Sequence, residues 1–349
     1  MKVFYSDAHL AHRPRYYFPE GCQSELFLET PERAERVLAA LRGVAWAEIL
    51  PPANFGLEPI LAVHSTRYLD YLSTAYAEWQ SCSPIEGQAF IPGSYTIDRQ
   101  TALSRDVPEQ AGFFLMSAHV PITTGTYAAA LSAAQCALSG AQAVAQGQPP
   151  YCGGQRAAFA LCRPPGHHAG REICGGFCFL NNAAIAAQWL SERGKVAILD
   201  IDFHAGNGTQ DIFYERPDVL TVSLHADPGR EYPNYAGYAS ETGAGPGAGY
   251  HRNYPLPAGT DDARYLHTLR QALDLIAKFD PIHLVVSAGM DTYKNDPLSD
   301  FTITRQGIAE IGRSIASLNL PTLVVMEGGY DIESLGENVV NLLAAFAPP

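Results

Sequence analysis

Lysine is scarce in this chain of 349 residues, and no apolar run reaches the roughly 18 to 20 residues that a membrane-spanning helix needs. Only 23 basic residues, four of them lysine, stand against 36 acidic ones, which leaves a formal net charge of -13. The basic residues form no stripe that could neutralise phosphates, so we expect neither nucleic acid nor a membrane as a partner. The acidity is compatible with a cationic ligand and equally with a role in solubility alone.

The seven cysteines are scattered along the chain and form no C-x-x-C pair. This spacing argues against a disulfide framework and against a structural zinc site closed by four protein ligands. We therefore expect the cysteines to be reduced packing residues. The first residues lack the apolar segment and the small-residue cleavage site of a secretory signal, which favours a cytoplasmic protein.

Short apolar runs alternate with longer helical stretches along the chain. The runs that we predict as strands are 2–6, 157–162, 196–201, 219–224, 282–288 and 322–326. They are apolar throughout, as expected for strands that are buried on both faces of a parallel sheet. The predicted helices cover 30–41, 127–145, 182–193, 262–277, 305–317 and 334–346. This alternation predicts one α/β domain over residues 1–349, with a mainly parallel central sheet and helices on both faces.

Residues 80–124 break this alternation. The segment is rich in proline, glycine, serine and aromatic residues and shows neither a helical nor a strand period. A loop of this length within a compact domain is usually functional or disordered.

Acidic residues and a histidine follow two of the predicted strands, where the active sites of parallel α/β sheets lie. Asp200, Asp202 and His204 alternate at the end of one strand and therefore point to one side, and Asp291 directly follows another. The alternative is a structural cluster held by backbone amides, which would still leave carboxylates close together in a low dielectric. We therefore predict a metal site, and Asp-His-Asp with an open position is typical of a catalytic one.

Two further strand ends carry residues suited to proton transfer. His167 and His168 follow a proline-glycine turn after the run 157–162, and adjacent imidazoles beside a metal can act as general acid and base. Tyr330 follows two glycines after the run 322–326, where the backbone can bend closely and aim the phenol. A histidine pair or a tyrosine by itself would be an ordinary feature, so their place at the same sheet edge carries the prediction.

The segments RPPGHHA, DIDFHAGNGTQ, SLHADP, AGMDTYKNDP and EGGYD together resemble the zinc-dependent histone deacetylase family of the arginase/deacetylase superfamily. Within that family the chain is similar to bacterial acetylpolyamine amidohydrolases over essentially its whole length. The resemblance implies an arginase/deacetylase-like fold and a hydrolase acting on linear amides. It would remove an acetyl or other short acyl group from a small cationic amine, such as an acetylpolyamine or an acetyl-diamine.

The resemblance also assigns roles to the residues at the strand ends. It implies one catalytic Zn2+ bound by Asp202, His204 and Asp291. It implies His167 and His168 as the acid-base pair and Tyr330 as the group that polarises the substrate carbonyl. His167 is expected to pair with Asp200, and His168 with Asn207, where many relatives have aspartate. Because an amide stabilises an imidazolium less than a carboxylate does, we expect His168 to be neutral at pH 7.

One or two structural K+ ions are implied in the same way. The first would be bound by the side chains of Asp200 and Ser223 and the carbonyls of Asp202, His204 and Leu224. The second would be bound by the carbonyls of Phe213, Arg216 and Val219.

Substrate contacts are also expected from the resemblance. Phe177 and Tyr232 align with the walls of the family's substrate tunnel. The insertion at about 80–124 is expected to mediate a homodimer and to narrow the tunnel mouth. Two positions that are acidic in acetylpolyamine amidohydrolases are occupied by Pro108 and His119, and Asp106 and Glu109 could bind the substrate ammonium instead.

Three alternatives differ from this reading. An acetyllysine protein or peptide deacetylase of the same family remains open. A di-manganese ureohydrolase would need a further carboxylate at the position of Gly289. A catalytically inactive relative would have lost a metal ligand, the histidine pair or Tyr330, and all of these are present.

Overall fold

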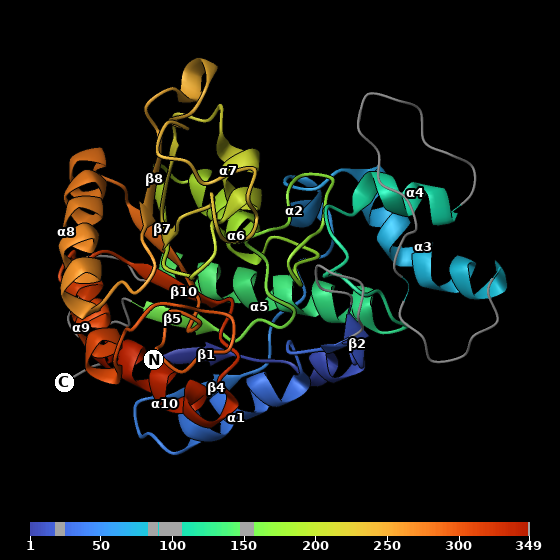
Figure 1. Ribbon diagram of the computed structural model, residues 1–349, viewed down its shortest axis with the longest axis horizontal. Coiled ribbons are helices and arrows are strands. Elements are labelled where there is room, and N and C mark those ends of the chain that lie inside the picture. The colour runs from blue at the N-terminus through green and yellow to red at the C-terminus, as the bar shows by residue number, and fades with distance from the viewer. Residues whose placement is uncertain (18–24, 83–89, 91–106, 147–156, 348–349) are drawn as a thin grey trace.

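Parallel strands form the centre of the computed structural model, which describes residues 1–17, 25–82, 90, 107–146 and 157–347 (Figure 1). The eight-stranded sheet has the order β4-β1-β5-β10-β9-β6-β7-β8, and every pair in it is parallel. Its strands are β1 Lys2–Phe4, β4 Glu48–Leu50, β5 Ala157–Ala160, β6 Val196–Asp200, β7 Val219–Ala226, β8 His251–Leu256, β9 His283–Ala288 and β10 Thr322–Met326. A small antiparallel pair consists of β2 Tyr16–Tyr17 and β3 Glu25–Leu26.

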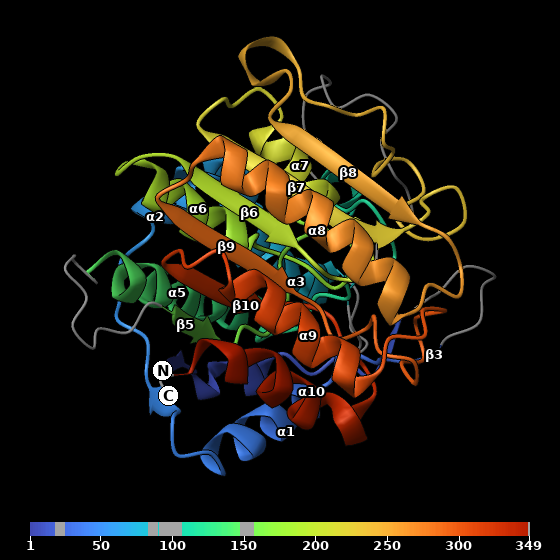
Figure 2. The same ribbon diagram turned by 90° about the vertical axis from the view of Figure 1, so that its left-hand side faces the viewer.

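Helices cover both faces of the sheet (Figure 2). Those on one face are α1 Pro31–Arg42, α8 Asp262–Phe279, α9 Arg305–Ala316 and α10 Ile332–Leu343. Those whose apolar residues share the core of the other face are α2 Glu58–Leu61, α3 Thr66–Cys82, α4 Val107–Phe114, α5 Thr126–Ala145, α6 Asn182–Ser191 and α7 Asn207–Phe213. None of the helices in the described part of the chain is both long and apolar enough to span a bilayer.

Each central strand contributes to two hydrophobic cores. In β10, Leu323 and Val325 belong to the core beneath α5, whereas Val324 and Met326 belong to the core beneath α9 and α10. Successive side chains of a strand point to opposite faces, so a strand covered on both sides is apolar at most of its positions. The predicted α/β fold, with a parallel sheet between two helical layers, is therefore confirmed.

Several elements were not predicted, and each has a local reason. Strand β8 lies at the edge of the sheet, exposes Arg252 and contains Pro255, so it lacks the continuous apolar run of a central strand. Helix α4 lies within the segment 80–124, for which we predicted no helix. It was missed because its eight residues are too few to show a helical period. The longer helix α3 buries Tyr68, Leu69 and Leu72, a helical spacing that the prediction overlooked.

Removing a side chain from a central strand should cost far more stability than removing the same side chain from the surface. Leu323 is fully buried on β10, so we expect Leu323→Ala to lower the free energy of unfolding by about 2–5 kcal/mol. Leu26 is 71% exposed, and Leu26→Ala should change this free energy by less than about 0.5 kcal/mol. Urea titration of both variants measures the difference, and equal midpoints would contradict the assigned burial.

Candidate active site

The candidate site lies at the carboxyl ends of four neighbouring strands, β5, β10, β9 and β6. The histidine pair follows β5, the tyrosine loop follows β10, Asp291 follows β9, and the segment from Asp200 to His204 leaves β6. Residues that are up to about 160 positions apart in the chain meet here because parallel strands end at the same edge. Gly166 and Glu327, for example, are in direct hydrogen-bonding contact although they are 161 positions apart.

Three side chains place metal-binding atoms around one point. The ligand atoms of Asp202, His204 and Asp291 all lie within 4.8 Å of one another. His204 Nδ1 is 3.4 Å from Asp202 Oδ1 and 3.2 Å from Asp291 Oδ2. Both carboxylates are fully buried. Burial lowers the pKa of His204, but the two carboxylates outweigh it and raise this pKa to about 10, which shows how strongly the site attracts positive charge.

Backbone glycines and amides surround these carboxylates. A Cβ atom at Gly289 or Gly328 would collide with the carboxylates of Asp202 and Asp291. The backbone N–H of Gly328 donates to Asp202 Oδ2 at 2.8 Å, and the N–H of Phe203 donates to Asp291 Oδ1 at 3.0 Å. Each carboxylate is therefore oriented by the chain while its other oxygen faces His204, and a divalent cation fits this donor set. The same contacts leave no space at position 289 for a carboxylate side chain that could bind a second metal ion.

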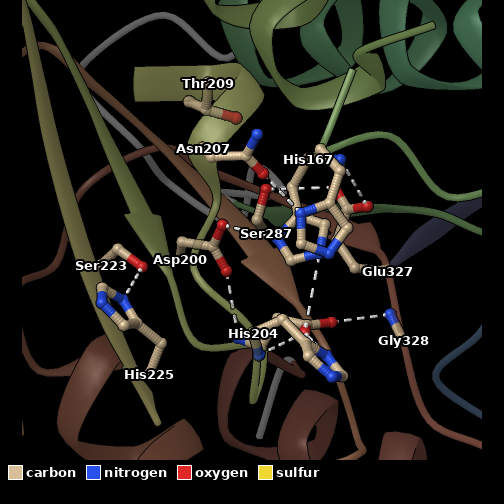
Figure 3. Close-up of polar contacts among 12 residues, drawn as sticks. His167, Asp200, His204, Asn207, Thr209, Ser223, His225, Ser287, Glu327 and Gly328 are labelled. Carbon is tan, nitrogen blue, oxygen red and sulfur yellow. Dashed lines mark hydrogen bonds and ion pairs between the residues drawn. The ribbon is translucent and has the colours of Figure 1, made fainter. Parts of the chain in front are cut away.

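The tandem histidines are held by different partners, and Figure 3 shows His167 together with Asp200. His167 Nδ1 lies 2.9 Å from Asp200 Oδ2, and His168 Nδ1 lies 2.7 Å from Asn207 Oδ1. Burial lowers the pKa of His167, but Asp202 and Asp200 outweigh it and raise this pKa well above its ordinary value. Burial lowers the pKa of His168 well below its ordinary value, and the neighbouring His167 adds to that effect.

The Asn207 amide settles which nitrogen of His168 is free. Its Oδ1 can only accept a hydrogen bond, so His168 must carry its proton on Nδ1. The Asn207 amide nitrogen lies 3.5 Å from the sulfur of Met116, which fixes the orientation of the amide. The Nε2 atom of a neutral His168 therefore carries a free lone pair that can accept a proton. This arrangement agrees with the neutral state that we expected for His168.

Tyr330 is positioned by a buried arginine and a buried carboxylate. Arg33 donates to the carbonyls of Glu327 and Gly329, both at 2.6 Å, and its guanidinium lies 4.7 Å from the centre of the Tyr330 ring. Asp296 accepts hydrogen bonds from the backbone N–H of Tyr330 at 2.5 Å. Burial raises the pKa of the phenol well above 10, so it remains a hydrogen-bond donor at neutral pH.

Sequence reasoning did not identify Glu327, although this residue joins three parts of the site. One carboxylate oxygen accepts from the backbone N–H groups of Gly166 at 2.6 Å and His167 at 3.1 Å. The other oxygen accepts from the Ser287 hydroxyl at 3.1 Å (Figure 3). Glu327 is fully buried, and that burial raises its pKa to about 7. A glutamate that ends a wholly apolar run was the available signal, because an acid is rarely buried without partners.

A cavity of about 330 Å³ opens beside His204, one of the three candidate metal ligands. Its lining includes His168, His204 and Tyr330 at the floor, and Phe177 and Tyr232, the two expected wall residues. The Tyr232 ring lies 4.9 Å from the His168 ring, and the Phe177 ring lies 5.7 Å from the Tyr330 ring, as distances between ring centres.

The backbone conformation at Gly176 and Phe177 positions the Phe177 side chain in the cavity lining. Gly176 has a φ of 51° and Phe177 a φ of 68°, both in the left-handed region. A Cβ atom at Gly176 would collide with the ring of His168, so only glycine fits there. His119, at one of the expected acidic positions, also lines the cavity, and its ring centre lies 5.7 Å from that of Tyr232.

The remaining expected residues lie as follows. Asp200 and Ser223 are paired across β6 and β7, next to the buried Leu224. Phe213 ends α7, Val219 begins β7, and Arg216 lies in the connection between them. Asp106 lies outside the described residues, and Glu109 is placed only as a residue of α4.

Residues 27–346 match the histone deacetylase domain. The chain belongs to the histone deacetylase family. The acetylpolyamine amidohydrolase of Mycoplana ramosa is 43% identical over 350 residues, which cover 99% of this chain and 100% of the relative. Acetylpolyamine amidohydrolase 1 of Pseudomonas aeruginosa is 44% identical, and the match covers 99% of each chain.

Solved structures support the same grouping for this histone deacetylase family member. The crystal structure of an acetylpolyamine aminohydrolase from Burkholderia pseudomallei matches with a TM-score of 0.94 at 42% identity, covering 99% of this chain and 98% of that chain. The family resemblance inferred from the motifs is therefore confirmed, as is its similarity to bacterial acetylpolyamine amidohydrolases. Membership of the family identifies the chain as a hydrolytic, metal-dependent enzyme.

Two substitutions of Glu327 should distinguish how much its size and how much its hydrogen bonds contribute to the free energy of unfolding. Glu327→Ala leaves two backbone N–H groups and the Ser287 hydroxyl without a buried partner, so we expect a loss of about 2–5 kcal/mol in the free energy of unfolding. Glu327→Gln can turn its oxygen toward the N–H groups and its nitrogen toward Ser287, and should lose less than half as much. Chemical denaturation measures both, and equal losses would show that the hydrogen bonds do not carry the effect.

Proposed function

We propose that this protein is a zinc-dependent amidohydrolase that removes an acetyl or other short acyl group from a small cationic amine, such as an acetylpolyamine or an acetyl-diamine. One observation carries the proposal: the Asp202, His204 and Asp291 ligand atoms converge beside His168 and Tyr330 at the floor of an aromatic-walled cavity. The names of the relatives in Mycoplana ramosa and Pseudomonas aeruginosa support the substrate class.

The metal would be held by Asp202, His204 and Asp291, a ligand set with room for further ligands. When bound, Zn2+ supplies Lewis acidity toward the amide oxygen and lowers the pKa of water to about 7 in favourable sites. The absence of a fourth protein ligand among the described residues near this triad fits a catalytic site better than a structural one.

His168 would act as the general base. Its Nδ1–H is bonded to Asn207, so Nε2 can take a proton from the attacking water and later give it to the departing amine nitrogen. A low pKa keeps this imidazole neutral and ready at pH 7. His167, whose pKa is raised by Asp202 and Asp200 against the effect of burial, would remain charged and contribute electrostatic stabilisation.

Tyr330 would stabilise the developing negative charge on the substrate oxygen. Its phenol stays protonated because burial raises its pKa, and it lines the same cavity as His168. A preorganised donor of this kind typically contributes about 10² to 10³ in kcat. Phe177 and Tyr232 would hold an unbranched methylene chain between apolar walls and exclude branched substrates.

Several expectations belong to the same proposal. Structural K+ would bind near Asp200 and Ser223, with a second K+ at the carbonyls of Phe213, Arg216 and Val219. The chain would act as one catalytic domain in the cytoplasm and form a homodimer through the segment 80–124. Asp106 and Glu109 would contact the substrate ammonium. Deacetylation of acetyllysine in proteins or peptides is the second candidate activity, because the family match covers residues 27–346.

Metal removal and a substrate panel should test the proposal directly. The protein should contain one Zn2+ per chain, lose activity on chelation and regain it when Zn2+ is returned. We expect kcat/KM for N-acetylputrescine, N-acetylcadaverine and N-acetylspermidine to exceed that for acetyllysine peptides. Tyr330→Phe, which retains the ring, should lower kcat by about 10² to 10³ without changing the metal content.

Other outcomes of these measurements would point elsewhere. Peptides that outperform every small amine would favour the protein deacetylase. Two Mn2+ per chain with urea release would indicate a ureohydrolase, and one Zn2+ without turnover of any amide would indicate an inactive relative.

The pH dependence should respond to the partner of His168. Asn207→Asp places a carboxylate beside Nδ1, which stabilises the imidazolium and raises the pKa of His168. The free base is then lost at a higher pH, so the acidic limb of the kcat/KM profile should move to higher pH. Asn54→Asp, an exposed change of the same charge, is the control and should leave the limb in place. An unshifted limb in Asn207→Asp would show that His168 is not the titrating base.

A further inference from the structure

Two side chains of opposite charge lie next to each other at the mouth of the cavity. Arg230 and Glu231 directly precede the wall residue Tyr232, and all three contribute to the cavity lining. The Arg230 side chain is exposed and Glu231 is half-buried. Among the residues that the structure describes, neither side chain forms an ion pair within 4.0 Å. The mouth therefore presents one positive and one negative side chain that the described residues do not hold in an ion pair.

The segment that carries this pair is held at both ends. The backbone N–H groups of Arg230 and Glu231 donate to the carbonyl of Asp227 at 2.9 and 3.0 Å, which closes a turn directly after β7. Beyond the pair, His225 Nε2 lies 2.8 Å from the carbonyl of Gly237 and ties the following loop back to the strand. The two charges are therefore anchored on ordered backbone beside the cavity wall, which reduces the entropy lost when a ligand binds.

We propose that Arg230 and Glu231 bind the zwitterionic end of a free ω-N-acetylated diamino acid, such as Nε-acetyllysine, and that the protein hydrolyses this compound. The α-carboxylate would pair with the Arg230 guanidinium and the α-ammonium with the Glu231 carboxylate. In the reaction the oxygen of water bonds to the carbonyl carbon, the C–N bond breaks, and a proton from water goes to the nitrogen, so acetate and the free diamino acid leave. This inference rests on the proposed amidohydrolase activity and extends its substrate class.

The charges at the mouth distinguish this substrate from the related amides. An acetylated polyamine is purely cationic, so Glu231 attracts it and Arg230 repels it. An acetyllysine residue inside a peptide carries no charge on its α substituents, so it leaves both side chains unpaired. Only the free amino acid satisfies both groups at once.

The distances along the chain suit such a ligand. Consecutive Cα atoms are about 3.8 Å apart, so the Cα atoms of Arg230 and Glu231 lie within about 8 Å of the Tyr232 Cα atom. The Tyr232 ring in turn lies 4.9 Å from the ring of His168, as a distance between ring centres. An unbranched methylene chain can therefore lie along the wall with its amide at the floor while its α-carbon stays at the mouth.

Three amides that differ only in charge test the inference on the zinc-loaded protein. They are Nε-acetyllysine, N-acetylcadaverine, which lacks the carboxylate, and N-pentylacetamide, which lacks both charges. We expect Arg230→Gln to lower kcat/KM for Nε-acetyllysine about tenfold, the effect of losing a charged hydrogen bond, and to leave N-acetylcadaverine unchanged or improved. Glu231→Gln should lower kcat/KM for both charged amides relative to N-pentylacetamide.

Asp300→Asn is the matched control. Asp300 is exposed and does not line the cavity. Burial raises the pKa of Glu231, and the negative charge of Asp300 raises it further, so Asp300 lies near Glu231. Because Asp300 does not line the cavity, Asp300→Asn should change kcat/KM for the three amides much less than Glu231→Gln does. Thermal unfolding of all three variants should match the parent protein, because the substituted side chains lie at the surface or the rim.

The results separate this inference from the proposed function. Hydrolysis of N-acetylcadaverine without hydrolysis of Nε-acetyllysine would overturn the inference and leave the amidohydrolase in place. The inference is also wrong if Arg230→Gln lowers kcat/KM equally for Nε-acetyllysine and N-acetylcadaverine. It is wrong as well if Arg230→Gln lowers kcat/KM for a blocked acetyllysine peptide as much as for the free amino acid. If the zinc-loaded protein hydrolyses no acetylated amine at all, the proposed function and the inference are both wrong.

Discussion

Two buried carboxylates that face the same point constrain the rest of this structure. Asp202 and Asp291 lie at the ends of neighbouring strands, and both are fully buried. Like charges repel strongly in a low dielectric, so they can remain together only if positive charge lies between them. His204 meets part of that need, which is why its pKa rises to about 10, and a divalent cation would meet it fully. Binding of metal and stability of the fold are therefore linked.

The loops around the carboxylates are held by a second set of buried charges. Glu29 accepts from the Arg33 guanidinium at 2.7 Å and lies 2.9 Å from Arg163 Nε. The same Arg33 holds the carbonyls of the tyrosine loop, and Arg163 holds the carbonyls of the N-terminal segment at His9 and His12. Such buried ion pairs add little net stability, but each missing partner would leave an uncompensated charge. These contacts tie the tyrosine loop and the N-terminal segment to Glu29 and to Arg163, four residues before His167.

Much of the fold was readable from the sequence because the central strands are apolar on both faces. The predicted runs 196–201 and 322–326 correspond to β6 and β10. Of the three residues that we expected on one side after β6, Asp202 and His204 offer ligand atoms to the same group. The edge strand β8 was missed because one of its faces is partly solvated and its composition is mixed. Glu327 was missed because its partners are backbone N–H groups that no sequence pattern reveals.

The sequence by itself determined the parallel α/β architecture, the family and the set of residues with metal-binding and acid-base chemistry. These follow from short-range patterns: apolar periodicity, turn residues and groups of polar side chains at strand ends. Only the tertiary structure decided how Arg33, Asp296 and Glu327 orient those residues, which nitrogen of His168 is free, and that Arg230 and Glu231 share the cavity mouth. Such relations depend on distances between segments far apart in the chain, and those distances are set by packing of the sheet and its loops rather than by local pattern.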